Sequence, residues 1–384
     1  MFLSMRNLTR TIDLSFTNKK SCFLFGPRQT GKSTLLRTSF PNSPFFNLLS
    51  SDLFLKYSKR PSIFREEVLS IQDKSVPIII DEIQKIPAIL DEVHQLIEDG
   101  YLFILTGSSA RKLKRGGANL LGGRARERHL YPFTSNELKE FKLEQIINFG
   151  TLPSIYFSDD PTDDLNSYNG TYLKEEIQAE GLVRNLPYFS KFLEVAAVCN
   201  SEQINYASIA SDVGVSAKTI KNYFEILEDT LIGEILNPYT KTTKRKSVSI
   251  PKFYFFDVGV ANNLAGRFNI EKKSELFGKC FEHFIFCEIR SYLAYSNDQR
   301  KLTFWRSISM HEVDFIIGDD VAIEVKATEL VTTKHLKGLN ALSEEISFKY
   351  QIIVSLDSHE RLVNSNIQIL PYKIFLSRLW NNKY

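Results

Sequence analysis

The chain has 384 residues, of which 43% are hydrophobic, and its 48 Lys and Arg against 45 Asp and Glu leave a formal charge of +3. This length predicts two or three domains, and the near balance of charge neither demands nor excludes a polyanionic partner. The apolar runs are strand-sized, far short of the roughly 20 residues that span a bilayer, and residues 1–16 lack the apolar stretch of a secretory signal, which argues against membrane insertion and export.

The first segment, residues 1–140, alternates short apolar runs with helical patterns. The runs lie between residues 21 and 133 and read SCFLFG, SPFFNLL, VPIIIDEI, YLFILTGSS and ERHLYPF. Strands that alternate with helices predict βαβ units and a parallel sheet. We therefore expect an α/β domain here.

A glycine-rich loop lies between the first of these runs and an amphipathic helical pattern. It consists of Gly26, Pro27, Arg28, Gln29, Thr30, Gly31, Lys32 and Ser33, with Thr34 one step into the helix. In the pattern GxxxxGKS, backbone N–H groups wrap phosphate oxygens at a helix N-terminus. Lys32 is expected to reach the β- and γ-phosphates and the Ser33 hydroxyl to coordinate Mg²⁺. The loop predicts an ATP site, and a chance match in an unrelated loop is the less favoured alternative.

The third apolar run ends in two acidic residues, Asp81 and Glu82. This is typical of a Walker B motif, in which Asp81 would hold the Mg²⁺ shell and Glu82 would orient the attacking water. The alternative is that both residues only cap the helix that starts near Pro87.

Two further features resemble ATPase motifs. The fourth run ends in the residues TGSS, which resembles the sensor strand of AAA+ ATPases, with Ser108 as the expected reader of the γ-phosphate and Thr106 as its rival. Arg124 and Arg126 precede the fifth run. An arginine there would neutralise transition-state charge, in cis or from a neighbouring subunit, and solvated surface arginines are the alternative.

Taken together, the glycine-rich loop, the Asp-Glu pair, the TGSS strand and GRARERHLYPF resemble the AAA+ ATPases of prokaryotes that carry a C-terminal domain of unknown function. The resemblance covers nearly the whole chain. It implies a P-loop ATPase domain, with ATP and Mg²⁺ as cofactors.

The second segment, residues 141–266, has helical patterns at 190–199, 206–213 and 216–231, followed by the strand patterns GEILNPY and PKFYFFDVG. The third helical pattern starts at Ser216, a good N-cap, and its apolar and polar residues separate onto two faces. The expected exposed face carries Lys218, Thr219, Lys221 and Asn222. This spacing suits a helix-turn-helix, and the basic run at 241–246 would form a wing over DNA phosphates. The segment looks like a winged helix, with a protein-contact module or ATPase lid as the alternative.

The third segment, residues 267–384, predicts a mixed α/β domain. Asp314 lies in the strand pattern EVDFIIG, and Glu324 and Lys326 share one face of the next, VAIEVKA. A turn at 318–320 would bring the three together, and two carboxylates with a lysine suit Mg²⁺ or Mn²⁺. The arrangement resembles the PD-(D/E)XK nucleases, a restriction-endonuclease-like fold. That resemblance implies a helical glutamate as a further ligand, for which Glu282 is the candidate and Glu288 the alternate.

Cysteine and histidine residues give weaker signals. Cys280, His283 and Cys287 fall on one helical face, but core packing is favoured over zinc because no fourth ligand is evident. His311, beside Glu312 and Asp314, is a candidate proton shuttle, with a structural role as the alternative. None of the four cysteines forms a CxxC pair, which predicts free thiols and a reducing, cytoplasmic location.

The leading hypothesis is a cytoplasmic ATPase that hydrolyses ATP with Mg²⁺ to control a DNA-engaging C-terminal half, with metal-dependent nuclease activity as a further hypothesis. The alternative is a nucleotide-gated regulatory or scaffold protein. It would bind a protein partner or form a homo-oligomer while an inactive nuclease-like domain serves as scaffold.

Overall fold

The structure of the chain is a computed structural model that describes residues 8–109, 120–172, 185–242, 245 and 247–384. It divides into two compact units, residues 1–132 with 229–232, and residues 133–228 with 233–384. The border near residue 132 lies close to the end of the first predicted segment. In the part of the chain that the structure describes, no helix is long and apolar enough to cross a membrane.

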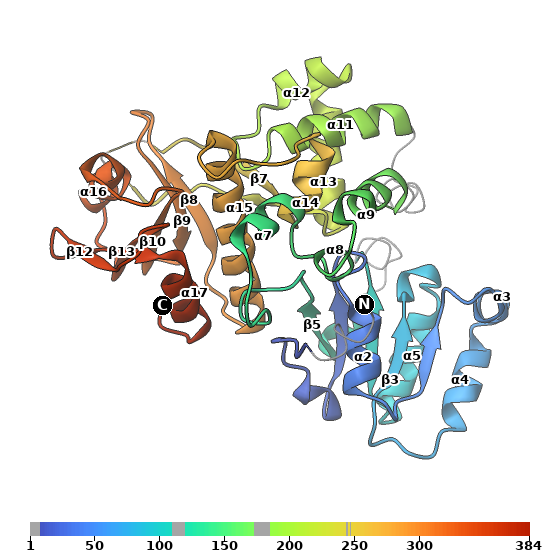
Figure 1. The fold of residues 1–384 in the computed structure, drawn as a ribbon. Coiled ribbons are helices and arrows are strands. Elements are labelled where there is room, and N and C mark those ends of the chain that lie inside the picture. Colours follow the sequence, from blue (N-terminus) through green and yellow to red (C-terminus); the bar gives the residue numbers. More distant parts are fainter. Residues whose placement is uncertain (1–7, 110–119, 173–184, 243–244, 246) are drawn as a thin grey trace. The chain divides into compact units, whose positions relative to one another are not determined.

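The first unit is built on a five-stranded sheet (Figure 1). Its strand order is β2-β3-β4-β1-β5, and every neighbouring pair is parallel. The strands are β1 Ser21–Phe25, β2 Phe45–Asn47, β3 Ile78–Asp81, β4 Phe103–Gly107 and β5 Ala125–His129. The parallel α/β sheet expected from the sequence is therefore confirmed.

Helices of the first unit bury apolar side chains against this sheet. They are α2 Lys32–Ser39, α3 Ser51–Lys59, α4 Ser62–Leu69 and α5 Ile89–Glu98, with short helical turns η1 Ser15–Asn18, η2 Ile83–Lys85 and η3 Leu120–Gly123. Alternate strand residues, such as Phe23 and Phe25, share one core with Phe64 of α4 and Val93 of α5. This burial fixes the strand ends, where the glycine-rich loop and the Asp-Glu pair lie.

The fifth strand starts two residues before the expected ERHLYPF run. It pairs with β1 from Ala125 to His129, because Ala125 lies opposite Ser21, the first residue of β1. We had expected Arg126 to precede this strand, but it lies within it.

The second unit begins with a helical part that contains one antiparallel strand pair, β6 with β7. Its elements are α7 Leu143–Phe149, α8 Pro153–Tyr156, α9 Pro161–Ser167, η4 Tyr168–Tyr172, α11 Leu186–Val198, α12 Tyr206–Val213, α13 Ala217–Asp229, β6 Gly233–Leu236, β7 Lys252–Phe255 and α14 Val258–Leu264. The backbone N–H of Thr219 donates to Ser216 Oγ at 3.1 Å, so Ser216 caps α13 as predicted. Ile220, Tyr223 and Phe224 are buried, whereas Lys218 and Lys221 are exposed.

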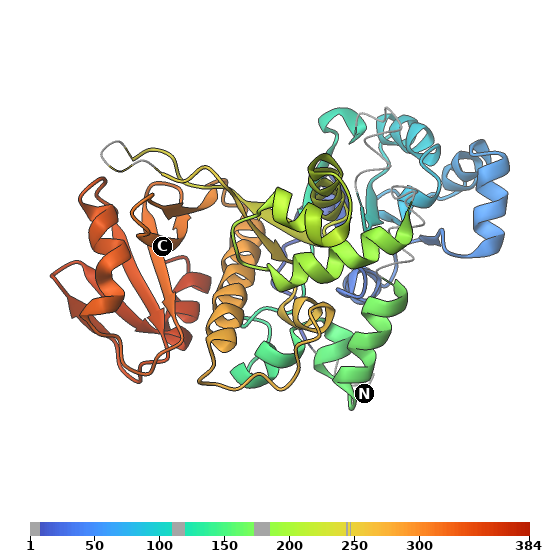
Figure 2. The same cartoon turned by 90° about the horizontal axis from the view of Figure 1, so that it is seen from above.

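The rest of the second unit is a six-stranded mixed sheet of order β12-β13-β11-β10-β9-β8. Its elements are α15 Glu275–Tyr295, β8 Leu302–Arg306, β9 Glu312–Ile317, β10 Val321–Lys326, η5 Thr333–Leu336, α16 Lys337–Ser343, β11 Tyr350–Ser355, β12 Arg361–Val363, β13 Ile367–Pro371 and α17 Tyr372–Trp380. Helices α15 and α17 pack on one face of this sheet and α16 on the other (Figures 1 and 2). The mixed α/β architecture agrees with the prediction.

The two parts of the second unit share one hydrophobic core. Ile147 of α7, Tyr254 of β7 and Phe286 of α15 belong to the same buried cluster, and the rings of Tyr254 and Phe286 stack at 4.1 Å. Backbone hydrogen bonds also join the segment between β6 and β7 to β8, from Tyr239 N to Phe304 O at 2.6 Å. The predicted border at residue 266 thus lies inside one compact unit, although a three-part division by function stays a prediction.

Candidate functional site

The glycine-rich loop connects β1 with α2 and owes its shape to close backbone contacts. A Cβ atom on Gly26 would lie 2.3 Å from the carbonyl oxygen of Leu130, and Gly31 has a φ of +91°. Gln29 has a φ of 62°, and Thr30 Oγ1 donates to Pro27 O at 2.9 Å. Glycine alone avoids a side-chain clash at the first position and backbone strain at the second. The loop therefore turns tightly into the N-terminus of α2.

Lys32 and Ser33 begin α2 and face the end of β3. The Lys32 ammonium donates to Gly26 O at 2.6 Å and to Pro27 O at 3.0 Å, so it lies inside the loop and is buried. The Ser33 hydroxyl donates to Asp81 Oδ2 at 2.8 Å. The structure thus brings together the hydroxyl and the carboxylate that we expected to share Mg²⁺.

Glu82 directly follows β3 and belongs to a small polar network. Its backbone is left-handed, with a φ of 63°, and its N–H donates to Thr106 Oγ1 at 3.1 Å. Thr106 donates in turn to Asp81 Oδ1. The Gln84 amide donates to both Glu82 Oε2, at 2.5 Å, and Ser108 Oγ, at 3.1 Å. Of the two sensor candidates, Thr106 thus contacts the Walker B aspartate, and Ser108 is linked to Glu82 through Gln84.

Sequence reasoning missed two contributors to this site. Gln84 lies in η2 and is 3% exposed, and its Oε1 accepts no hydrogen bond within the described residues. Arg10 donates to the backbone oxygens of Thr30, at 2.8 Å, and Tyr131, at 2.6 Å, so it fastens the glycine-rich loop from outside. Neither residue belongs to a motif, because its role depends on chain segments that meet only in the fold.

The remaining predicted residues of the first unit lie away from these contacts. The Arg124 guanidinium bonds Glu98 of α5 at 2.6 Å, and that of Arg126 lies 4.8 Å from the ring centre of Phe16. The Thr34 carbonyl accepts a hydrogen bond from the Thr38 hydroxyl at 2.8 Å. The contacts described for Arg124 and Arg126 thus do not include the P-loop of the same chain.

A second cluster of charges lies in the C-terminal sheet. Strands β9 and β10 pair antiparallel around the turn at 318–320, in a register that runs from Val321 opposite Ile317 to Ile323 opposite Phe315. The Lys326 ammonium lies 2.6 Å from Glu324 Oε1 and 3.8 Å from Asp314 Oδ2, and the Val325 N–H donates to Asp314 Oδ2 at 2.7 Å. Both carboxylates are 5% exposed. The predicted grouping of Asp314, Glu324 and Lys326 therefore occurs in the structure.

Glu282 of α15 joins this cluster through a lysine that the sequence did not single out. Lys252, the first residue of β7, is 4% exposed. Its ammonium lies 3.2 Å from Glu282 Oε1 and 2.6 Å from Glu312 Oε1, and the Tyr254 hydroxyl also donates to Glu282 Oε1, at 2.6 Å. We call Glu282, Glu312, Asp314 and Glu324, with Lys252 and Lys326, the carboxylate centre.

Burial governs the protonation of this centre. It raises the pKa of Glu324 well above its usual range; Asp314 adds to the rise and Lys326 opposes it. Burial likewise raises the pKa of Glu282, against the attraction of Lys252. For Lys252, burial lowers the pKa, but Glu282, Glu312 and Asp314 outweigh it and raise the pKa overall. A carboxyl group in such surroundings gains from a proton or a cation.

The donor set allows a test of the expected metal ion. Glu324 Oε2 is buried and has no hydrogen-bond partner within the described residues, and Mg²⁺ in proteins commonly uses one or two carboxylates with substrate phosphates. In the described residues, however, no group of three or more His, Cys, Asp or Glu could hold a metal ion. The chemistry of Asp314 and Glu324 fits such an ion, whereas Glu282 is held by Lys252 and Tyr254.

The alternate residue Glu288 lies in a different network. Its carboxylate accepts from Ser135 N and Oγ, each at 2.7 Å, and from Trp380 Nε1 at 2.8 Å, and burial raises its pKa to about 7. Ser135 and Trp380 line a cavity of about 780 Å³. On the helix α15, Glu288 stands six residues after Glu282, so it faces another direction and does not reach Asp314 or Glu324 through these contacts.

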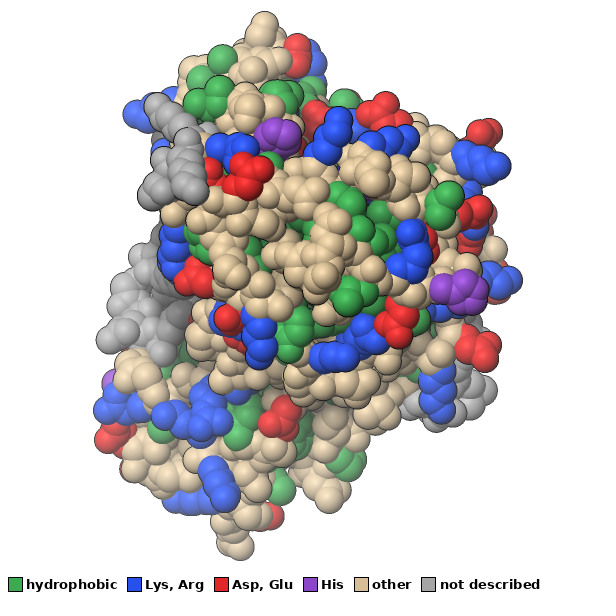
Figure 3. Space-filling model, turned by 90° about the vertical axis from the view of Figure 1, so that its left-hand side faces the viewer, with side chains coloured by type: hydrophobic (Ala, Val, Ile, Leu, Met, Phe, Trp, Pro, Cys, Tyr) green, Lys and Arg blue, Asp and Glu red, His purple; other side chains and the backbone are tan. Residues whose placement is uncertain are grey.

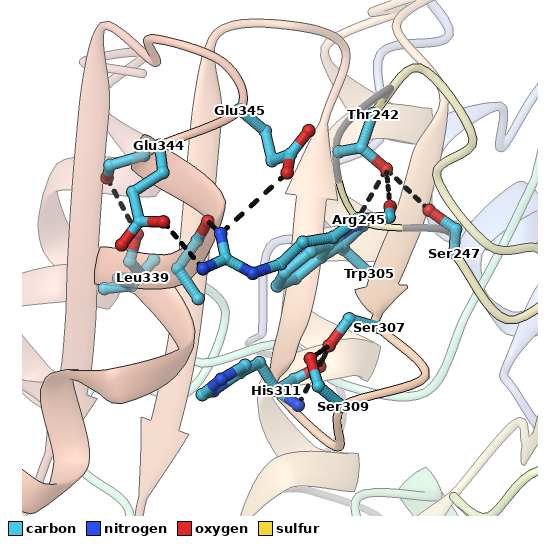
Figure 4. Close-up of polar contacts among 12 residues, drawn as sticks. Thr242, Arg245, Ser247, Trp305, Ser307, Ser309, His311, Leu339, Glu344 and Glu345 are labelled. Atoms are coloured by element: carbon cyan, nitrogen blue, oxygen red, sulfur yellow. Dashed lines mark hydrogen bonds and ion pairs between the residues drawn. The ribbon is translucent and has the colours of Figure 1, made fainter.

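The cysteine and histidine candidates of α15 have separate partners. His283 contacts Phe255 O at 2.6 Å and Asn200 at 3.1 Å, and burial lowers its pKa to about 3. Cys280 donates to Asn262, and Cys287 to Phe256 O. These contacts agree with the core packing that we favoured over zinc. The N–H of His311 donates to Ser307 Oγ at 3.1 Å in the β8–β9 turn (Figure 4).

The basic run at 241–246, expected as a wing over DNA phosphates, lies partly in ion pairs. Arg245 bonds Glu344 at 2.6 Å and Ala341 O at 3.0 Å, and Figure 4 shows its guanidinium directed at Glu344 and Glu345. Lys241 bonds Asp319 at 2.6 Å, while Lys244 lies outside the described residues. Acidic and basic side chains are interspersed over much of the face in Figure 3. Nearby acids thus pair with Lys241 and Arg245, and the wing over DNA phosphates stays a prediction.

Family comparisons divide the chain into three stretches. Residues 18–139 match the model of an AAA domain. Residues 140–271 and 277–375 match two domains of unknown function, DUF8612 and DUF4143. The first match, together with the parallel sheet, identifies the first unit as a P-loop domain of AAA type.

Individual relatives are distant. An uncharacterized protein from Mycobacterium tuberculosis is 22% identical over 85% of this chain and 75% of its own length. Another, from Methanocaldococcus jannaschii, is 23% identical over 77% of this chain and 68% of its own. A solved Signal Transduction ATPase with Numerous Domains (STAND) protein with a tetratricopeptide repeat sensor, from Pyrococcus horikoshii, matches 77% of this chain at 14% identity and a TM-score of 0.20. The chain spans only 49% of that protein, and a TM-score this low does not establish a common fold.

Proposed function

We propose that the first unit binds ATP with Mg²⁺ and hydrolyses it. The observation that carries this proposal is the 2.8 Å contact between Ser33 Oγ and Asp81 Oδ2, which joins the glycine-rich loop to the end of β3. A hydroxyl and a carboxylate in this position are the protein ligands that P-loop enzymes use for Mg²⁺. When bound, the ion would neutralise charge on the β- and γ-phosphates.

In this proposal each polar group of the site has one task. Lys32, now bonded to loop carbonyls, pairs with phosphate oxygens, and backbone N–H groups at the start of α2 cradle them. Glu82 orients the attacking water, and its carboxylate is held by Gln84. Ser108, which bonds the same amide, reports on the γ-phosphate. The unpartnered Gln84 Oε1 is the kind of buried acceptor that a water or ligand satisfies.

The test separates binding from hydrolysis. In Glu82→Gln the shape of the site is kept but the negative charge is lost, so we expect ATP affinity within about threefold of wild type and a fall in kcat of roughly 100-fold, the range for loss of a general base. Glu66→Gln is the matched control, because Glu66 pairs with Arg60 on the surface. Wild-type turnover in Glu82→Gln would remove Glu82 from the mechanism, whereas undetectable ATP hydrolysis by wild type would favour a nucleotide-gated regulator.

We further propose that the second unit engages DNA, with the carboxylate centre as a metal-dependent nuclease site. Three antiparallel strands, β8, β9 and β10, follow α15, and β10 pairs parallel with β11. This order sets Asp314, Glu324 and Lys326 on adjoining strands, as the PD-(D/E)XK resemblance implies. Asp314 and Glu324 would hold Mg²⁺ or Mn²⁺, which would activate water and stabilise phosphate charge. Lys326 would orient the water.

The helical part supports DNA engagement as a winged helix. Helices α11, α12 and α13 precede the antiparallel pair β6–β7, and an isolated bridge joins Gln203, between α11 and α12, to Lys252 of β7. The exposed face of α13, with Lys218, Lys221 and Asn222, suits the major groove. Because Lys241 and Arg245 are ion-paired, we assign the DNA contact to α13.

Cleavage of plasmid and linear DNA with Mg²⁺ or Mn²⁺, with and without ATP, tests the nuclease proposal. Cleavage by wild type that is lost in Glu324→Ala, but kept in the surface control Glu329→Ala, would assign the site. If wild type cleaves nothing with either metal, the second unit has a binding role.

A regulatory or scaffold function is the alternative. It is favoured by the two lysines that already neutralise carboxylates of the centre. Stimulation of ATP hydrolysis by DNA supports the ATPase with a DNA-engaging second unit, since coupling needs a ligand that distinguishes nucleotide states. ATP-dependent self-association without DNA stimulation, measured by sedimentation, supports the alternative of a homo-oligomer or protein partner.

A further inference from the structure

Lys252 is a buried cation that belongs to no motif. It is contributed by β7, 62 residues before Asp314 in the chain, and its backbone is fixed on two sides, by Leu236 of β6 and by the bridge to Gln203. Its ammonium lies between Glu282 Oε1 and Glu312 Oε1. Lysine is almost never fully buried unless it is paired, and here two carboxylates serve as its partners. The middle segment therefore supplies a cation to carboxylates that all lie in residues 267–384.

The charges around Lys252 do not cancel. The carboxylate centre has four acids, and the cations that pair with them are Lys252, Lys326 and Arg306, which lies 3.2 Å from Glu312 Oε2. With all seven groups ionised, four negative and three positive charges leave a formal charge of −1. Loss of Lys252 would make it −2, in surroundings where charges interact more strongly than in water. Lys252 thus competes directly with any cation that approaches this centre.

We propose that Lys252 is the internal cation of the carboxylate centre, which holds Glu282 and Glu312, lowers the affinity of Asp314 and Glu324 for a divalent cation, and adds attraction for a phosphate group. This inference rests on the second proposed function, in which the centre takes a metal ion and DNA. It gives Lys252 the role of a positioning residue. It also explains why Glu282, the third carboxylate expected as a ligand, is bonded to protein groups.

The proposed role of Lys252 can be distinguished from a purely structural role. Removal of its charge should change the affinities for a divalent cation and for a phosphate in opposite directions. Without the charge of Lys252, a divalent cation meets one positive charge fewer and binds more tightly, whereas a phosphate loses an attractive partner and binds more weakly. A substitution that only damaged the fold would weaken both. The direction of the change in cation affinity is therefore decisive.

The test is a calorimetric titration of Mn²⁺ into the full chain without nucleotide, in an Asp81→Asn background that removes the carboxylate of the P-loop site. The variants are Lys252→Met, which is apolar and suits burial, and Lys252→Gln, which keeps hydrogen-bond donors for Glu282 and Glu312. We expect Mn²⁺ to bind about tenfold more tightly in both, the lower end of the effect that one neighbouring charge has on a carboxyl group. Binding of a short DNA duplex should weaken.

Two controls complete the design. Glu324→Gln should abolish the Mn²⁺ signal, which ties it to the centre. The double variant Lys252→Gln with Glu312→Gln restores the formal charge to −1 and should return Mn²⁺ affinity to within about twofold of wild type, if Lys252 acts through charge.

The outcomes separate this inference from the function on which it rests. If Mn²⁺ binds wild type and Lys252→Gln equally, or the variant more weakly, Lys252 is only structural and the inference is overturned, while the metal site stands. If wild type binds no Mn²⁺ but Lys252→Gln gains binding that Glu324→Gln abolishes, the inference holds and the native metal site does not. If neither binds, both are overturned.

Discussion

The two candidate sites hold their charges in different ways. At the P-loop site, Lys32 bonds uncharged backbone carbonyls and Asp81 accepts from the hydroxyl groups of Ser33 and Thr106. At the carboxylate centre, Lys252 and Lys326 each bond carboxylates directly. A ligand at the first site replaces hydrogen bonds to uncharged partners, whereas a cation at the second must compete with ammonium groups that are already present.

This difference has an energetic consequence. Breaking a buried ion pair by removing one partner costs about 3–5 kcal/mol, while a hydrogen bond between a charged and an uncharged group contributes about 1.5–3 kcal/mol. Removing one partner of the carboxylate centre should therefore destabilise the second unit whatever else the centre does, and its pairing is weak evidence of catalysis. The hydrogen bonds of the P-loop site have less structural effect, so their arrangement indicates a ligand more directly.

The largest effect that we expect follows from how tightly α16 packs on the carboxylate centre. A Cβ atom on Gly338 would lie 1.9 Å from Glu312 O and 3.3 Å from Glu324 Oε2. Gly338→Ala should therefore lower the free energy of unfolding by roughly 3 kcal/mol, the upper range for overpacking. Gly278→Ala is the control, because its nearest neighbour is Ala327 at 4.0 Å, and it should stabilise α15 by about 0.5–1 kcal/mol. Equal stability of both variants in urea would contradict the close packing.

The next effect concerns pH and the buried acids of the second unit. Burial raises the pKa of Glu288 from 4.5 to about 7, so the folded state holds this proton more tightly than the unfolded state. The stability that this group contributes is present below about pH 4.5 and is lost as pH rises through about 7. Roughly 2.5 kcal/mol of it is lost between pH 5 and 8, at about 1.4 kcal/mol per pKa unit. Glu288→Gln should show a smaller decline in urea unfolding between pH 5 and 8.

The matched control for this experiment is Glu329→Gln, since Glu329 is an exposed carboxylate with 70% of its side chain accessible. It should keep the wild-type pH profile. An unchanged profile in Glu288→Gln would mean that its carboxyl group titrates alike in the folded and unfolded states.

The smallest effect separates the two basic surfaces of the second unit. If α13 contacts DNA, Lys218→Ala with Lys221→Ala should flatten the slope of log affinity against log salt by about 2, close to one unit per phosphate contact. Arg245→Ala should leave the slope unchanged, because Glu344 and Ala341 O hold its guanidinium. The reverse result, measured by fluorescence anisotropy, would return the DNA contact to the basic run.

Much of the fold could be predicted because local patterns agree with burial. The expected helix over 206–213 matches α12, and the helical pattern over 216–231 contains α13. Strands β12 and β13 and helices α16 and α17 were not predicted. The short β12 has exposed residues such as Leu362 and lacks a clear alternation of apolar and polar residues. Whether such a segment forms a strand depends on its pairing with other strands, which the local sequence does not show.

The two candidate sites also differ in how far the sequence alone could locate their residues. Lys32, Ser33, Asp81 and Glu82 come from motifs whose spacing the loop and the strand end dictate, so the sequence located them. Lys252, Gln84 and Arg10 carry no local signal. Lysine before an apolar strand reads as a solvated flank, and only the packing of β7 against α15 reveals its carboxylate partners. Ion pairs of Arg245 were equally invisible, because their acids lie about 100 residues away.

The central claim is that the P-loop site binds ATP, and the most direct test is ATP affinity in Lys32→Ala beside Lys19→Ala, measured with a fluorescent nucleotide. Lys32 would make charge-assisted hydrogen bonds to phosphate, each contributing about 1.5–3 kcal/mol, so we predict at least a tenfold loss of affinity in Lys32→Ala. The exposed Lys19 should be replaceable without effect. Wild-type affinity in Lys32→Ala would contradict the assignment of the nucleotide site.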